Sequence, residues 1–172
     1  MKIKLFVFIL SIVSWTMGCS QSISHSTERA MPEVRILDKG IIGPEPQAHA
    51  PSLILVNNLK GLQEVYRNFH TTSFGMATPK LPEINFSTHR GLMVCMGIKP
   101  SGGYGLLLLD DYAIIRDNAA EIMLQWIQPE KGAIVPQMLT SPWLLIQIEH
   151  GDYKEFIIKD GEGKEILRQP FP

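Results

Sequence analysis

The sequence is poor in cysteine, in excess charge of either sign and, after its first residues, in long apolar runs. Its 172 residues include two cysteines, and the formal net charge is −1. A near-neutral chain without a basic stretch lacks the electrostatic signature of nucleic-acid binding, so no nucleic-acid partner is expected. The five histidines show no metal-ligand spacing, so neither a metal nor another cofactor is expected.

The first 18 residues have the composition of a secretory signal peptide. Lys2 and Lys4 precede an apolar stretch over residues 5–13, which is shorter than the ~20 residues of a spanning helix. Small Gly18 comes directly before Cys19. This junction resembles a bacterial lipobox, in which the cysteine is acylated with diacylglycerol and becomes the new N-terminus. Residues 16 and 17 depart from the usual lipobox pattern, and the alternative is an ordinary signal peptide cut at the same bond.

Lipidation at Cys19 predicts a lipid-anchored protein of the bacterial cell envelope. Ser20 differs from the Asp that retains such lipoproteins at an inner membrane, so the outer membrane is the expected destination. Residues 19–33 are polar and rich in serine, and we interpret them as a flexible tether. Because acylation would use Cys19, Cys95 would stand alone and the mature chain would have no internal disulfide.

Residues 34–172 predict one domain that is mainly β (α+β), with antiparallel sheets and one packed α-helix. Short apolar runs between turn residues predict strands at 34–37, 52–56, 92–97, 104–109, 112–116, 121–128, 142–149, 153–159 and 165–167. Two hairpins are expected. The turn at 99–103 would join the strands on either side of it, and Gly151-Asp152 would join 142–149 to 153–159.

Residues 59–69 have the apolar spacing of a helix. Asn58 is a suitable N-cap because its side-chain oxygen can accept a free backbone N–H of the first turn. A single apolar stripe means a single buried face, so the helix is expected to lie on a sheet. The stripe consists of Leu59, Leu62, Val65, Tyr66 and Phe69.

No catalytic set emerges from the sequence. The segment ending in Gly102 and Gly103 lacks the Gly-Lys-Ser/Thr end of a phosphate-binding loop and leads into a strand, so we interpret these glycines as a structural turn. Cys95 lies in an apolar strand without a basic neighbour, which is typical of an inert buried thiol rather than of a nucleophile.

Two stretches carry a resemblance to a known family. GLMVCMGIKPSGGYGLLLL and WIQPEKGAIVPQMLTSPWLLIQI resemble the C-terminal domain of the protease-complex subunit PrcB family. With the predicted helix, the resemblance covers residues 53–149. It implies a small secreted or lipid-anchored bacterial domain, and the family takes its name from a lipoprotein that associates with a surface protease. Most members of this family have no assigned activity.

The candidate binding residues lie in and beside the loop between the strands at 121–128 and 142–149. Apolar side chains beside an ordered loop are typical anchors of protein contacts. The predicted binding set is Tyr104, Ile134, Met138, Leu139 and Trp143. The alternative is that this loop only closes one end of the core.

These observations predict a non-enzymatic, lipid-anchored extracytoplasmic interaction module. Its expected partners are the membrane, through the lipid, and an envelope protein such as a protease, which it would assist or stabilise. The alternative is a small-ligand binding protein with a pocket lined by Tyr104 and Trp126. A hydrolase would need a nucleophile and a base that converge, and the sequence indicates no such pair.

Overall fold

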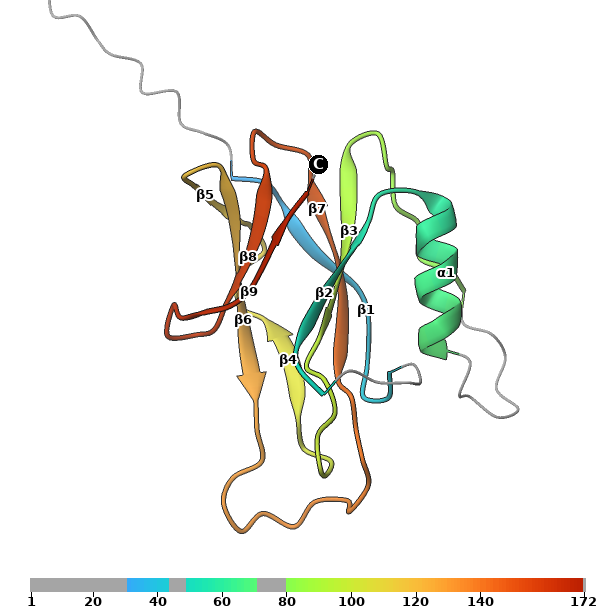
Figure 1. Ribbon diagram of the computed structural model, residues 1–172, viewed down its shortest axis with the longest axis vertical. Helices are drawn as coiled ribbons and strands as arrows, with labels where there is room; N and C mark the ends of the chain where they lie inside the picture. The colour runs from blue at the N-terminus through green and yellow to red at the C-terminus, as the bar shows by residue number, and fades with distance from the viewer. Residues whose placement is uncertain (1–30, 44–48, 71–79, 172) are drawn as a thin grey trace, which may run out of the picture.

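The computed structural model describes residues 31–43, 49–70 and 80–171. The predicted signal peptide, Cys19, most of the tether and parts of two predicted loops lie outside these residues. In chain order the elements are β1 (Val34–Gly40), β2 (Ser52–Val56), α1 (Leu59–His70), β3 (His89–Cys95), β4 (Gly105–Leu108), β5 (Ile114–Arg116), β6 (Ala119–Ile127), β7 (Trp143–Glu149), β8 (Glu155–Lys159) and β9 (Glu165–Pro170) (Figure 1). No helix of the described part is long and apolar enough to cross a membrane.

The strands form two sheets. The first sheet is fully antiparallel and has the order β1-β7-β3-β2. The second sheet has the order β4-β6-β8-β9, and β5 pairs with β6 beside this path. The second sheet is mixed, because β6 and β8 run parallel while its other pairs are antiparallel. The predicted class, mainly β with one helix, is therefore confirmed, and the sheets are antiparallel except at this one pair.

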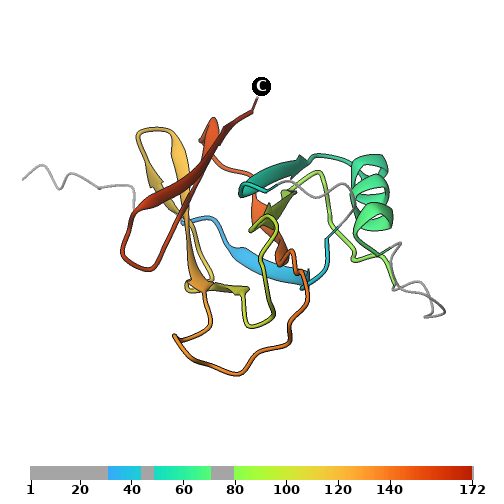
Figure 2. The same ribbon diagram turned by 60° about the horizontal axis from the view of Figure 1, so that its bottom comes forward.

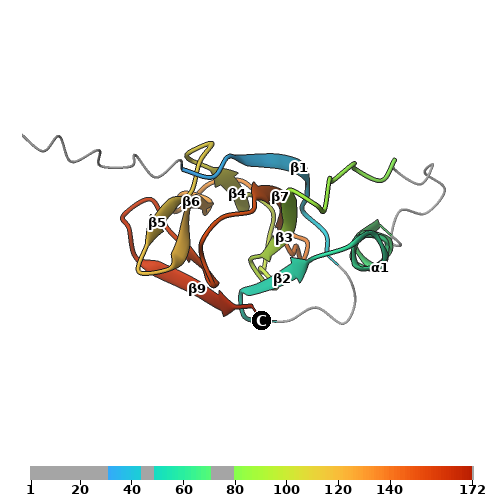
Figure 3. The same cartoon turned by 90° about the horizontal axis from the view of Figure 1, so that it is seen from above.

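The elements are stacked in three layers, with the first sheet between the second sheet and α1 (Figures 2 and 3). The sandwich core lies between the two sheets and contains residues such as Leu92, Ile122 and Phe156. The helix core lies between the first sheet and α1 and contains residues such as Leu62, Phe69 and Trp143.

Strand β3 contributes to both cores because its side chains alternate between the two faces of the sheet. Leu92 and Val94 are buried in the sandwich core, whereas Met93 and Cys95 are buried in the helix core. Strand β7 follows the same rule. Burial on both faces explains why these two strands appear in the sequence as nearly continuous apolar runs.

Helix α1 begins as the sequence predicts. The Asn58 Oδ1 atom accepts a hydrogen bond from the backbone N–H of Gly61 at 2.8 Å, which is an N-cap. Leu62, Tyr66 and Phe69 of the predicted stripe are buried against the first sheet. Leu59 is 55% exposed, so its predicted place in the buried stripe is wrong. It is the first helical residue and projects beyond the edge of the sheet contact.

Both predicted hairpins are wrong. The turn after β3 leads into β4, but β3 pairs with β2 and β7 in the first sheet, and β4 pairs with β6 in the second. Strand β7 likewise lies in the first sheet and β8 in the second, so Gly151-Asp152 also connects two sheets. A connection between stacked sheets uses the same turn residues as a hairpin. Local sequence therefore cannot distinguish the two.

A hairpin that was not predicted joins β5 to β6. Asp117 and Asn118 have φ angles of 50° and 62°, and they link Arg116 to its partner Ala119. Positive φ at both central residues is the geometry of a type I′ turn, and Asn and Asp tolerate it better than other non-glycine residues.

Candidate functional site

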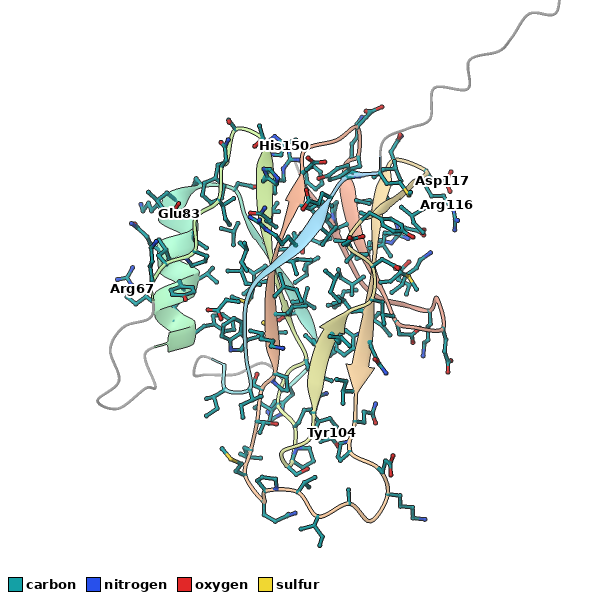
Figure 4. The ribbon with its side chains drawn as sticks, turned by 180° about the vertical axis from the view of Figure 1, so that it is seen from behind. Arg67, Glu83, Tyr104, Arg116, Asp117 and His150 are labelled. Carbon is teal, nitrogen blue, oxygen red and sulfur yellow. The ribbon has the colours of Figure 1, made fainter. Side chains whose placement is uncertain are left out.

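The loop between β6 and β7 exposes apolar side chains at one end of the molecule. The Ile134 side chain is fully exposed, that of Leu139 is 68% exposed, and that of Met138 is 43% exposed. We call these three residues the apolar loop surface. In Figure 4 this loop forms the lower end of the domain, beyond the labelled Tyr104. Exposed apolar groups gathered on one segment are typical of interaction sites.

Hydrogen bonds hold this loop against the turn that follows β3. Lys99 and Thr140 exchange two backbone hydrogen bonds of 2.7 and 3.0 Å. The N–H of Gly102 donates to the carbonyl of Pro136 at 2.8 Å, and the Thr140 hydroxyl donates to the carbonyl of Ser101 at 2.8 Å. A loop held in this way loses little conformational freedom when a partner binds.

Gly102 and Gly103 allow the turn to lie close to the loop. Gly103 has a φ of +84°, which favours glycine. A Cβ atom on Gly102 would lie 3.0 Å from Cδ of Pro136, so the turn and the loop approach closely. The predicted structural turn is therefore the part of the fold that supports the apolar loop surface.

Trp143 does not belong to this surface. Its side chain is 2% exposed and lies in the helix core, where its ring meets that of Phe69 edge to face with centroids 5.3 Å apart. Its Nε1–H donates to the carbonyl of Ile42 at 2.9 Å. The expectation that Trp143 forms an exposed patch with the loop residues is wrong, because β7 turns this position toward α1.

Tyr104 and Trp126 differ from the apolar loop surface in being partly buried. Both rings are partly buried and pack against the sandwich core. The Nζ atom of Lys99 lies 6.0 Å from the centroid of the Tyr104 ring. Neither ring lines any of three grooves on the surface of the described residues, so these grooves give no support to a pocket formed by this pair.

The Cys95 thiol is not an activated nucleophile. Burial raises the pKa of the Cys95 thiol to about 11, so the thiol stays protonated at neutral pH. Burial lowers the pKa of His150, and the positive charge of Arg90 lowers it further. No group of three or more His, Cys, Asp or Glu side chains among residues 31–43, 49–70 and 80–171 is arranged to hold a metal ion.

A groove that the sequence does not predict lies between two strand edges. It has a volume of about 580 Å³ and lies between β1 and the end of β4. Its lining consists of Val34, Arg35, Ile36, Leu108, Leu109, Asp110 and Asp111. No sequence signal indicates this groove, because it depends on which strands form the edges of the two sheets.

Together, the fold and the exposed loop define a small β-rich domain that carries exposed apolar side chains at one end. The family model described as PrcB C-terminal matches residues 92–149, which confirms the predicted resemblance over this stretch. The match runs from within β3 to the end of β7, and it includes the glycine turn and the apolar loop surface. Comparisons with curated proteins and with solved structures returned no match.

Proposed function

We propose that this protein is a non-catalytic accessory module that binds another protein of the cell envelope through the apolar loop surface. The observation that carries the proposal is the exposure of Ile134, Met138 and Leu139 on a loop held by backbone hydrogen bonds. Burying such side chains against a partner is favourable by ~25 cal/mol per Å² of apolar surface. The loop keeps them in water in the free protein.

The family match supports a protease-like protein as the partner. The PrcB family resembled by this chain is named after a subunit of a protease complex, and the matched stretch contains the proposed binding surface. We therefore propose a protease-like protein of the envelope as the partner. In this role the module would position or stabilise the protease and would supply no catalytic group.

We also propose that acylated Cys19 anchors the module in the outer membrane. The geometry of β1 fits this arrangement. Val34, at the start of β1, pairs with Ile148 near the end of β7, whereas the apolar loop surface precedes the start of β7. The chain thus enters the domain at the end opposite to the loop (Figure 1). The seven residues of β7 separate these two ends by about 20 Å. A lipid on the preceding segment would leave the loop facing away from the membrane.

Site-specific cross-linking in the native bacterium tests the docking surface. A photoreactive residue placed at Gln137, inside the loop, is expected to give an adduct with a protease-like envelope protein. Adding Leu139→Asp should abolish the adduct, because a charge would replace an apolar anchor. Leu59→Asp is the matched control, since Leu59 is also an exposed leucine but lies on α1. Equal adduct yields in the two variants would refute docking through the loop.

The anchor is tested separately by replacing Cys19 with Ser and separating membrane from soluble fractions. We expect the variant to leave the membrane fraction while purified protein still binds the partner. A variant that stays in the membrane fraction would overturn lipid anchoring at Cys19 without affecting the docking proposal.

A further inference from the structure

The edges of the two sheets face each other at the β1–β4 groove. Strand β1 is an edge of the first sheet, and β4 is an edge of the second. At one end the two edges are joined, because the N–H of Val34 donates to the carbonyl of Asp111 at 2.8 Å. Farther along, β1 and β4 are not neighbours in either sheet, and the groove opens between them. Figure 4 shows both strands on the same side of the molecule.

The backbone of β1 presents hydrogen-bonding groups to this groove. In an antiparallel pair, the residues that bond to the partner strand alternate with residues whose N–H and C=O point away. The N–H of Glu149 donates to the carbonyl of Glu33, so Glu33 and Arg35 face β7. Val34 and Ile36 therefore point away from β7, and the Val34–Asp111 bond confirms this direction.

The backbone of β4 presents its groups to the same groove. The N–H of Leu109 donates to the carbonyl of Met123 at 3.0 Å, so Leu109 and Leu107 face β6. The N–H and C=O of Leu108 point away from β6, toward β1. Two strand edges with unpaired groups thus border one groove, and an extended chain is the ligand that satisfies both.

The side chains of the groove indicate what the extended chain should carry. Ile36 is on the same face of β1 as buried Val34, yet it is 36% exposed because the sheets separate there. An apolar side chain would cover it. At the joined end, Asp110 and Asp111 line the groove, and no ion pair involves either of them within the described residues.

We propose that the β1–β4 groove binds an extended segment of the partner protein, which enters as an additional strand between the two sheets. This proposal deepens the proposed function and rests on it. Main-chain hydrogen bonds to Ile36 and Leu108 hold the segment. An apolar side chain packs on Ile36, and a lysine or arginine lies beside Asp110 and Asp111. The lining contains two carboxylates, Asp110 and Asp111, and one guanidinium, Arg35. Its net negative charge favours a cation at this end of the groove.

The test uses a fluorescein-labelled peptide of alternating valine and threonine with a lysine at one end, about seven residues long. Fluorescence anisotropy measures its binding to the full chain in detergent. We expect Ile36→Asp to weaken binding by about ten-fold or more. Ile54→Asp is the matched control, since Ile54 is also 36% exposed but lies on β2, at the opposite edge of the first sheet. Leu109→Asp, on the groove rim, is a second variant that does not depend on the folding of Ile36→Asp.

Two modified peptides test the chemistry of recognition. Methylation of alternate backbone nitrogens should abolish binding, because it removes the donors on one side of the strand. Exchanging the terminal lysine for glutamate should weaken binding to the natural chain, and the Asp110→Lys variant should favour the glutamate peptide.

Several outcomes would overturn the proposal. Equal binding by the Ile36→Asp and Ile54→Asp variants would do so, as would undiminished binding of the methylated peptide. Self-association of the full chain that Ile36→Asp removes would assign the groove to a second copy instead. The proposed docking through the loop is distinguished by the cross-linking experiment. A partner adduct that Ile36→Asp leaves unchanged and Leu139→Asp abolishes would reject the groove and keep the loop.

Discussion

At the scale of single residues, the apolar side chains near the β6–β7 loop divide into two kinds with different roles. Ile134 and Leu139 are exposed and contribute little to the stability of the free protein. Trp143 is buried between β7 and α1, and it joins three segments by contacting Phe69 and donating a hydrogen bond to Ile42. Replacing a residue of the first kind should affect binding, whereas replacing Trp143 should affect folding.

Trp143→Ala is expected to lower the free energy of unfolding by about 3–5 kcal/mol, the range for removing a large buried aromatic side chain. Urea denaturation followed by circular dichroism measures this loss. Leu59→Ala is the control, and it should change stability by less than about 0.5 kcal/mol because Leu59 is exposed. Similar midpoints for both variants would contradict the tight packing of the helix core.

At the scale of elements, the glycine-rich segments make tight connections that local sequence identifies as turns but does not place. Gly97 follows β3 with a φ of +73°, and a Cβ atom there would lie 2.5 Å from the carbonyl oxygen of His49. Gly132, in the β6–β7 loop, has a φ of +87°. A Cβ atom on Gly132 would have no neighbouring atom within 4 Å. The two glycines therefore share a backbone conformation and differ in packing.

Comparison of Gly97→Ala with Gly132→Ala separates these two effects. Gly132→Ala should cost about 1–2 kcal/mol, the strain of a left-handed residue with a Cβ atom. Gly97→Ala should cost clearly more, because the added methyl meets backbone atoms that cannot move without displacing the segment before β2. Thermal unfolding of the two variants measures the difference. Equal losses of stability in the two variants would show that the backbone at His49 can move away from the added methyl at little cost.

At the scale of the whole molecule, the three layers differ in how deeply they are enclosed. Strands β3 and β7 are covered by the second sheet on one face and by α1 on the other. Helix α1 is the outermost layer and buries a single stripe that includes Leu62, Tyr66 and Phe69. We therefore expect the helix to separate from the first sheet while the sandwich core remains intact.

Native-state hydrogen exchange should reveal this order. The amides of β3 and β7 are expected to exchange last, through global unfolding, and those of α1 earlier, through local opening. Exchange measured by mass spectrometry at increasing denaturant resolves the two groups. If α1 exchanges as slowly as β3, the two cores unfold as one unit and the layered description of stability is wrong.

Much of the local structure could be predicted from the sequence. The apolar stretches located the strands and the helix, Asn58 marked the start of α1, and the apolar setting of Cys95 indicated a buried thiol. The loop with Ile134 and Leu139 was also identified. Each of these features depends on residue type, alternation or capping over a few neighbouring positions, which a single chain displays directly.

The sequence by itself thus determined where strands, turns and the helix form, because these follow from short-range preferences. The tertiary structure alone decided which strands pair, that β6 and β8 run parallel, that Trp143 faces α1, and that β1 and β4 leave a groove between them. The reason is physical. Strand partners are chosen by contacts between residues far apart in the chain, and a glycine turn has the same composition whether it closes a hairpin or crosses from one sheet to the other.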